Sequence, residues 1–455
     1  MKKYINISLL ALVALASLSL GSCKNEVDEI FDDDAVARLA KAQAEYVDIL
    51  TSQGGRWQLQ YYANANEQGY VYVMTFDKNG SVVISGMNQW IAMSMGQSSM
   101  GKVTPAYGSA TSLWDVITDN GPVLSFNSYN PYFHLFADPY DIPSIGSSSG
   151  LDGSSSDTNE SGYGHEGDYE FDIMKYSGDT LYLTGKKYNL NMIMVRIPEA
   201  GYPGDEVYMN EVTAMADSFF NAKIQEAYVN LPNGTRWVVK NGSTSILKMF
   251  REGDDEISTA ENHNVIITHD GLSFMNPLVL DGVTIQNFLL QPDGSLLCRE
   301  DMTTTMTADD LSKVITKPTS VWRLDLSDMT GHFAELFNKM VDELNDYQTR
   351  KLQYVELAYI PADNRYSVKF NVKRSTNRFN PTYYITMEQN GDTKVNVTVA
   401  AEGDKTGQSY AERIPSMRAL VDALAGEINL TANSLLSPTN IHFNNANGYI
   451  TWVMQ

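Results

Sequence analysis

Apolar and polar residues alternate with a period of two along much of the chain. In residues 56–61, every second residue is Trp, Leu or Tyr, and the residues between them are Arg or Gln. Such alternation is typical of a half-buried strand, with one face in a core and the other in water. Residues 70–76 and 81–85 are apolar runs separated by Asp-Lys-Asn-Gly, which predicts a hairpin. Further strands are expected at residues 113–118, 123–126, 169–174, 181–186, 192–197, 265–268, 272–275, 285–290, 295–298, 321–326, 355–360, 366–372, 383–387, 394–399, 441–443 and 449–453.

Helical periodicity interrupts the strands at a few places. Apolar residues recur at spacings of three and four over residues 36–50, 207–228 and 333–344, and a helix is also expected over residues 415–428. The first three helices each precede a run of strands. Gly-Arg-Trp at residues 55–57 follows the first helix and is echoed by Gly-Thr-Arg-Trp at residues 234–237, which predicts a repeated helix-then-β unit.

These patterns predict an α+β fold that is mostly antiparallel β. A parallel α/β fold would require regular strand–helix alternation, which is absent from the pattern. Closed barrels leave no exposed strand edge, so we expect barrel-like units, the first of them lipocalin-like by fold analogy. The expected domains are residues 35–200, 201–328 and 329–455, and a single domain formed by the last two is the alternative. The strand at residues 321–326 is expected to close the second unit.

The N-terminus carries the pattern of an exported protein. Lys2 and Lys3 precede an apolar run at residues 7–20, which is shorter than the ~20 apolar residues of a membrane-spanning helix. Small residues then lead to Ser22 and Cys23. This predicts a signal peptide at residues 1–22, cleavage between Ser22 and Cys23, and lipid such as palmitate on Cys23, as in the bacterial lipoprotein precursors that the stretch resembles. The alternative is an ordinary secretory signal that ends near a cysteine.

The net charge limits the expected partners, and the cysteine content limits the expected disulfides. Residues 23–34 are acidic and without periodicity, so we interpret them as a tether. The formal net charge of the chain is −22, which repels phosphate backbones and excludes nucleic acid from the expected partners. Cys298 is the one cysteine besides Cys23, so no disulfide is expected within the mature chain. We expect Cys298 to be a packed residue rather than a nucleophile.

Motifs for catalysis or metal binding are incomplete. Gly146–Gly150 fits the Gly-x-Ser-x-Gly pattern, but it lies in a Ser-, Gly- and Asp-rich surface loop over residues 137–168 rather than between a strand and a helix. The acidic residues from Asp152 to Glu160 do not have EF-hand spacing. His165-Glu166 has no second histidine four residues on. We therefore expect no catalytic residue, no metal site and no cofactor.

Aromatic residues are the remaining candidates for ligand contacts. Exposed rings stack on sugars or hold apolar ligands, whereas buried rings form the core of a sheet, which is the interpretation we favour. The six candidates are Trp90, Trp114, Tyr129, Tyr132, Phe133 and Phe136.

Several stretches together resemble an uncharacterised family of Bacteroidota outer-membrane lipoproteins, known as domain of unknown function family 4302. The stretches are residues 57–62, 70–85, 118–126 with the aromatic run to 139, 167–171 and 183–187. The resemblance covers most of the mature chain and is best over residues 55–198. It implies a lipoprotein that is encoded beside nutrient-uptake systems and other surface lipoproteins. It supplies no catalytic residues.

These inferences combine into one functional hypothesis. We expect a lipid-anchored protein of the outer membrane that faces the cell surface and binds a ligand or partner without catalysis. Its expected partners are the membrane through Cys23, other surface lipoproteins or an outer-membrane transporter, and a glycan or small apolar ligand. One alternative is a surface glycan or peptide hydrolase that uses paired carboxylates. The other is a structural subunit of a surface assembly.

Overall fold

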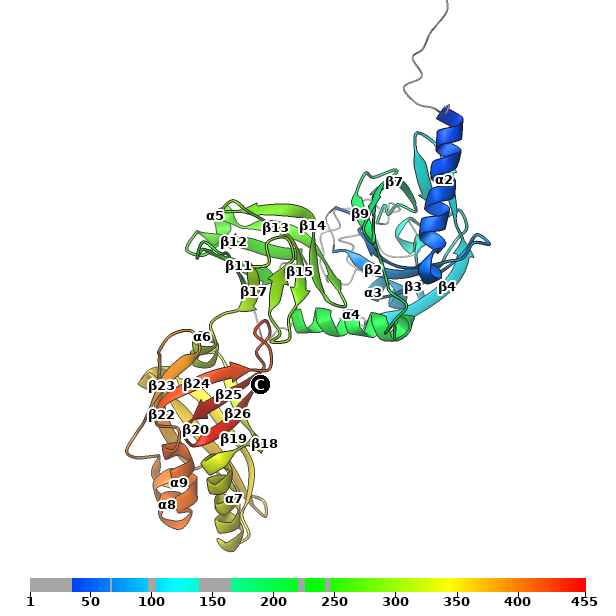
Figure 1. Cartoon of the computed structure of the whole chain (residues 1–455). Helices are drawn as coiled ribbons and strands as arrows, with labels where there is room; N and C mark the ends of the chain where they lie inside the picture. Colours follow the sequence, from blue (N-terminus) through cyan, green and yellow to red (C-terminus); the bar gives the residue numbers. More distant parts are fainter. Residues whose placement is uncertain (1–34, 66–67, 97–103, 139–164, 220–225, 242–245) are drawn as a thin grey trace, which may run out of the picture.

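The computed structural model describes residues 35–65, 68–96, 104–138, 165–219, 226–241 and 246–455. Three β units follow one another along the chain, with helices at their borders (Figure 1). The signal peptide, Cys23, the tether, Gly146–Gly150 and the acidic stretch from Asp152 to Glu160 lie outside the described residues. No helix of the described part of the chain is long and apolar enough to cross a membrane.

The first unit is a nine-stranded sheet whose two edges are consecutive along the chain. Its order is β4-β3-β2-β1-β9-β8-β7-β6-β5, and only Trp114 separates β4 from β5. The backbone N–H of Trp114 donates to the carbonyl of Gly80 over 3.0 Å, so the chain bends there and the sheet curls around one core. The elements are α2 (Ala35–Thr51), η1 (Gln53–Gly55), β1 (Arg56–Tyr61), β2 (Tyr70–Phe76), β3 (Ser81–Asn88), α3 (Gln89–Ser94), β4 (Ala106–Leu113), β5 (Asp115–Thr118), β6 (Pro122–Ser125), η2 (His134–Phe136), β7 (Glu170–Ser177), β8 (Thr180–Gly185) and β9 (Asn191–Arg196).

The second unit is a closed barrel of eight strands, β10 to β17, in sequence order. The helix α4 precedes it and lies along both the first and second units (Figure 1). The elements are α4 (Asp205–Phe219), β10 (Glu226–Asn230), β11 (Arg236–Asn241), β12 (Ile246–Arg251), α5 (Glu256–Thr259), β13 (Glu261–Thr268), β14 (Gly271–Leu280), β15 (Val283–Leu290), β16 (Leu296–Cys298) and β17 (Thr305–Ala308).

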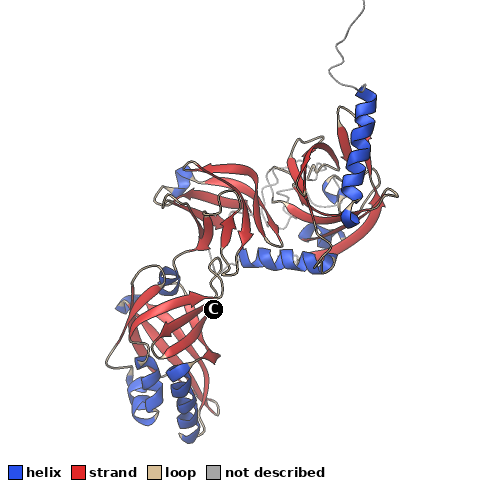
Figure 2. Cartoon of the chain, in the orientation of Figure 1, coloured by secondary structure: helices blue, strands red, loops and turns tan. Residues whose placement is uncertain are grey.

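The third unit is also a ring of eight strands. Its sheet has the order β19-β18-β26-β25-β24-β23-β22-β20-β21, and a further pairing of β19 with β20 closes the ring. Three helices gather at one end of this ring (Figure 2). The elements are α6 (Leu311–Thr316), β18 (Val321–Met329), α7 (Gly331–Asp346), β19 (Lys351–Ile360), η4 (Pro361–Asp363), β20 (Arg365–Arg374), β21 (Asn377–Phe379), β22 (Thr382–Gln389), β23 (Lys394–Val399), α8 (Lys405–Arg413), α9 (Pro415–Asp422), β24 (Gly426–Ala432), β25 (Asn440–Asn445) and β26 (Gly448–Met454).

The expected fold class is confirmed. Each strand pairing among the described residues is antiparallel, and the units are barrel-like with a helix before each. The Gly-Arg-Trp echo, however, does not mark equivalent positions. Trp57 lies on the first strand after a helix and its indole N–H donates to the Leu50 carbonyl over 2.8 Å. Trp237 lies on the second strand of its barrel and donates to Asp281 at the surface.

Three of the expected elements are wrong in extent or partner. The strand expected to close the second unit is β18, which pairs with β19 and β26 in the third unit, because alternation along a strand does not specify its neighbours. The helix expected to reach residue 228 ends at Phe219, and Tyr228 lies on β10. The helix expected to reach residue 428 ends at Asp422, because Gly426 has a φ of +100° and opens β24.

The strand β1 is buried on both faces, which differs from the half-buried strand expected from its alternation. Gln58 and Gln60, on the face opposite the core, are 5% and 7% exposed. A second apolar cluster lies on that face. It contains residues of the first sheet, of α4 and of the second barrel. Its buried members are Tyr62, Val71, Val73, Ile197, Tyr208, Met209, Val212 and Ile266. The first two units therefore share buried surface beside β1.

Candidate functional site

A cleft of about 840 Å³ lies between the outer face of the first sheet and the second barrel. One wall is formed by β1, β9, β8 and β7, and the other by β14, β15 and the residues that follow β16. The two units approach closely at one end of the cleft. There the backbone N–H of Gly69 donates to the Val265 carbonyl over 2.8 Å, and a Cβ at Gly69 would lie 2.7 Å from the Ile266 side chain. The cleft is therefore formed by the packing of the first unit against the second.

The first wall presents three rows of side chains that are set by strand register. Gln58 lies opposite Val195, which lies opposite Thr180 on β8. In the middle row Gln60 lies opposite Ile193, which lies opposite Tyr182, and in the third row Asn191 lies opposite Thr184. Residues directly opposite in an antiparallel pair share a face, so each row crosses the wall as neighbouring side chains. The middle row consequently places an amide, an aliphatic chain and an aromatic ring side by side.

Three residues at alternate positions of β1 and its end line the cleft: Gln58, Gln60 and Tyr62. The side-chain oxygen of Gln58 accepts a hydrogen bond from Tyr208. Within the described part of the chain, the Gln60 amide makes no hydrogen bond although the residue is 7% exposed. The buried hydroxyl of Tyr62 also has no partner there, and burial raises the pKa of Tyr62. Buried polar groups are normally paired, so the Tyr62 hydroxyl is an exception, whereas the Gln60 amide reaches the surface of the cleft and is open to a ligand.

The second wall presents neutral polar groups together with the carboxylates of Asp270 and Glu300 and the guanidinium of Arg299. The hydroxyl of Ser273 on β14 donates to the amide oxygen of Asn287 on β15 over 2.8 Å. Glu300 accepts hydrogen bonds from the backbone N–H of Asn287 and from its side-chain amide, the latter over 2.7 Å. Burial raises the pKa of Glu300, but hydrogen bonds from Cys298, Asn287 and Gln286 outweigh it and hold the pKa below its ordinary value. Glu300 is therefore a fixed acceptor that stays ionised, rather than a proton donor.

The other acids of the cleft also have partners. Asp270 accepts from the Thr268 hydroxyl over 2.8 Å. Asp179 lies 3.6 Å from the Arg196 guanidinium, which in turn donates to backbone carbonyls at the end of α2. These carboxylates hold the walls in place and do not face each other as a free pair.

Two smaller cavities extend the cleft around the contact between the units. One of about 420 Å³ shares Asn191 and Phe274 with the cleft, and one of about 440 Å³ shares Gln58 and Asp270. In the second of these, the rings of Tyr208 and His269 lie 4.4 Å apart. The hydrogen-bonding surface available to a ligand therefore runs beyond the main cleft.

The six aromatic candidates do not lie in this cleft. Trp90, Trp114, Phe133 and Phe136 are buried in the first core, and Tyr132 packs against it. The Trp90 indole N–H, for example, donates to the hydroxyl of Tyr70 over 2.7 Å. Tyr129 is 59% exposed and its ring lies 5.6 Å from the ring of His134. We therefore place the candidate binding site at the cleft and not at the aromatic run.

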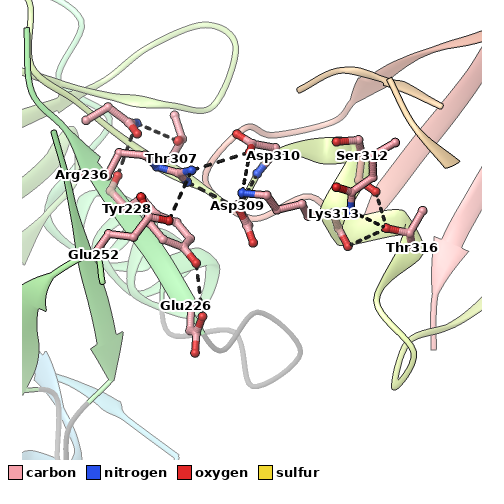
Figure 3. A network of polar contacts seen from close by, with 12 residues as sticks. Glu226, Tyr228, Arg236, Glu252, Thr307, Asp309, Asp310, Ser312, Lys313 and Thr316 are labelled. Carbon is pink, nitrogen blue, oxygen red and sulfur yellow. Dashed lines mark hydrogen bonds and ion pairs between the residues drawn. The ribbon is translucent and has the colours of Figure 1, made fainter. Parts of the chain in front are cut away.

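The adjacent carboxylates Asp309 and Asp310 form a charged cluster with Arg236 and Lys313 at the joint between the second and third units (Figure 3). Arg236 on β11 lies 3.4 Å from Asp309 and 3.6 Å from Asp310. Lys313 on α6 lies 3.3 Å and 2.8 Å from the same two acids. The Arg236 guanidinium also lies 3.9 Å from the centre of the Tyr228 ring. Because cations from both units compensate the pair, we assign it to joining the units.

The two other titratable residues discussed above, His165 and Cys298, are buried within the fold. The His165 ring is buried 4.4 Å from the Trp90 ring. Burial and a hydrogen bond to Glu300 raise the pKa of Cys298 to about 12. Among the described residues, no group of three or more His, Cys, Asp or Glu could hold a metal ion.

Sequence analysis missed Gln58 and Gln60 as site residues. Their alternation with Trp57 and Leu59 indicated a solvent-facing row, and the packing of α4 and the second barrel over that row is not visible in local periodicity. The residue type of Gln58 and Gln60 was the available signal, because both polar positions in the middle of β1 carry neutral amides rather than charged groups.

Comparisons with known proteins give a family without a known function. A family model described as a domain of unknown function (DUF4302) matches residues 27–292, which span most of both walls of the cleft. No curated protein matches the chain. Similar solved structures include the beta subunit of DNA polymerase from Streptococcus pyogenes, with 9% identity, 90% of this chain and 97% of that chain covered, and a TM-score of 0.13. Another is the isotype 1 transferrin binding protein B from serogroup B Neisseria meningitidis, with 8% identity, 88% and 75% covered, and a TM-score of 0.13. At these TM-scores neither structure supports an argument about this chain.

Proposed function

The chain belongs to the DUF4302 family, and from the cleft between its first two units we propose that it is a non-catalytic ligand-binding protein held at the outer surface of a bacterium by lipid on Cys23. The observation that carries the proposal is the Gln60 amide, which lines the cleft without a hydrogen bond in the described chain, beside the buried and unpaired hydroxyl of Tyr62. Leaving a buried polar group unpaired costs about 1–3 kcal/mol. A ligand that hydrogen-bonds to Gln60 and Tyr62 would recover that energy, which favours a binding site here.

The position of the cleft supports the same role. Ligand sites are common between packed domains, and about 840 Å³ lies within the usual range of about 300–1,000 Å³. The cleft acids have hydrogen-bond or ion-pair partners, which suits a surface that orients a ligand more than one that transfers protons. The family match covers most of both walls.

Binding is tested on a soluble chain that begins after Cys23. Calorimetric titration with panels of oligosaccharides, peptides and small apolar compounds is expected to identify a ligand. The Gln60→Met variant is expected to bind it at least tenfold more weakly, because its thioether replaces the amide at similar size. Gln389→Met, in the third unit, is the matched control and is expected to bind normally. Absence of binding by every panel, or equal binding by Gln60→Met, would overturn the proposal.

The anchoring part of the proposal has its own test. Labelled palmitate is expected to enter the full-length chain expressed in a bacterium that lipidates exported proteins, but not the Cys23→Ser variant. Protease added to intact cells is expected to remove the body of the wild-type protein if it faces outward. We further propose an outer-membrane transporter or other surface lipoproteins as partners, to be sought by crosslinking on intact cells. Release of the wild-type chain into the medium would contradict the anchor.

A further inference from the structure

Resting on the proposed binding function, we infer that the ligand of the cleft is an uncharged oligosaccharide. The walls present mainly amide and hydroxyl groups, which both donate and accept hydrogen bonds. Each sugar hydroxyl also donates one hydrogen bond and accepts others, so it can bind two such groups at once. The neutral polar residues at the centre are Gln58, Gln60 and Tyr62 on one wall and Ser273, Gln286 and Asn287 on the other.

The charged groups of the cleft disfavour an ionic ligand. The carboxylate of Glu300 is held by the N–H groups of Gln286 and Asn287, and Asp270 is held by a hydroxyl. The Lys175 ammonium lies 4.3 Å from the centre of the Tyr182 ring. Lys175 and Arg299 are both exposed, so their charges are solvated at the rim. The buried middle of the cleft consequently has no unpaired charge for a ligand to neutralise.

Strand pairing disfavours a peptide. An extended peptide most readily binds by adding a strand to a free sheet edge. β1 pairs with β2 and β9, and β8 pairs with β7 and β9. On the other wall, β14 pairs with β13 and β15, and β15 pairs with β14 and β16. Both walls are therefore made of interior strands, and they offer side chains instead of backbone edges.

The middle row of the first wall supplies a stacking surface. Tyr182 is 36% exposed and lines the cleft beside Ile193, with β9 between its strand and that of Gln60, and the Lys175 ammonium covers one face of its ring. The apolar face of a sugar ring packs on an aromatic face while its hydroxyls pair with nearby amides. Tyr182 and Gln60 in one row provide both contacts.

The experiment uses isothermal titration of the soluble chain with three sets of probes. They are neutral oligosaccharides of maltose, mannan and xylan, acidic oligosaccharides of polygalacturonate and chondroitin sulfate, and tryptic peptides of casein. A neutral set is expected to bind, with affinity unchanged between about 0.05 and 0.5 M NaCl, since screening affects charged pairs. Tyr182→Ala and Gln60→Met are each expected to weaken binding at least tenfold. Tyr384→Ala, which removes a ring under Arg365 in the third unit, is the control.

The outcomes separate this inference from the proposed function. Peptide binding that depends on Gln60, or tighter binding of acidic than neutral sugars, overturns the ligand class and leaves the binding function in place. Neutral sugar binding that survives both Tyr182→Ala and Gln60→Met overturns the assignment to the cleft. No binding by any set overturns the ligand class, and no binding by the small apolar compounds as well overturns the binding function.

Discussion

The hydroxyl of Tyr208 on α4 donates a hydrogen bond to the side-chain oxygen of Gln58 on β1 over 2.5 Å. The ring of Tyr208 also packs against His269, in the turn between β13 and β14. One tyrosine therefore contacts the first sheet and the second barrel from the helix that connects them. Because Gln58 lines the cleft, this contact fixes one end of the proposed site.

Removing that hydroxyl is expected to destabilise the contact between the first two units. Tyr208→Phe leaves the amide oxygen of Gln58 buried without its donor, at a cost of about 1–2 kcal/mol. Thermal unfolding followed by calorimetry should show a lower midpoint for the transition of these units. Tyr176→Phe is the control, since within the described chain that hydroxyl makes no hydrogen bond. Equal midpoints for Tyr208→Phe and wild type would contradict the assigned role.

Leu436 joins the second and third units. It lies on the loop between β24 and β25 of the third unit, yet it is buried in the core of the second barrel. The backbone N–H groups of Leu435 and Leu436 donate to the carbonyls of Asp293 and Gly294 over 3.0 and 3.1 Å. We expect Leu436→Ala to lower the free energy of unfolding of the barrel by about 2–5 kcal/mol.

Proteolysis measures the same change at the joint. In Leu436→Ala, cleavage between the second and third units is expected to be faster than in wild type under native conditions. Leu290→Ala, at a half-exposed position of β15, is the matched control and is expected to behave as wild type. A cleavage rate that does not change would show that the loop contributes little to the joint.

Local sequence pattern predicted most strands because burial alternates along them. β2, β3, β8 and β9 were expected near their observed positions. β17 was missed, because Thr-Met-Thr-Ala contains a single large apolar residue. The helix α8 was missed because its residues are mostly polar. Its start is set by Asp404, whose side chain accepts a hydrogen bond from the backbone N–H of Gly407.

The cleft could not be predicted in the same way. Gln58 and Gln60 have the spacing of a solvent-facing row, and that row is buried only because Tyr208 and Ile266, far along the chain, pack beside it. Contacts of such sequence separation leave no local periodic signal. For the six aromatic candidates, by contrast, sequence analysis favoured core over ligand contact, and five of them pack in or against the first core while Tyr129 is 59% exposed.

Cys298 is expected to resist modification while the protein is folded. Burial raises its pKa to about 12, so about one molecule in 10⁴ carries the thiolate at pH 8. Iodoacetamide should label the soluble chain only after unfolding in urea, as measured by intact mass. Rapid labelling of the native chain would show that β16 opens readily.

Glu300 gives a prediction about pH. Its hydrogen bonds hold its pKa below the ordinary 4.5, so its contribution to stability is present above that pH and is lost as the pH falls through the folded pKa. Glu300→Gln is expected to lower the free energy of unfolding by about 1 kcal/mol at neutral pH, allowing for solvent screening of a partly exposed group. Urea unfolding should show this difference shrinking toward about pH 3. Glu388→Gln, at an exposed position, is expected to show no such dependence.

Gln60 and Gln58 are expected to respond differently to the same substitution. Both are buried on one face of β1, but the amide of Gln58 holds Tyr208 and the amide of Gln60 makes no hydrogen bond within the described chain. Gln60→Met replaces an amide that has no partner in the described chain with an apolar group of similar size, so it is expected to leave the free energy of unfolding within about 0.5 kcal/mol of the wild-type value. Gln58→Met removes an acceptor and is expected to lower it by about 1 kcal/mol. Unchanged stability together with lost binding is what a residue that contacts a ligand should show. Urea unfolding of the two variants in parallel measures the difference, and destabilisation by Gln60→Met equal to that by Gln58→Met would mean that Gln60 serves the fold and not a ligand.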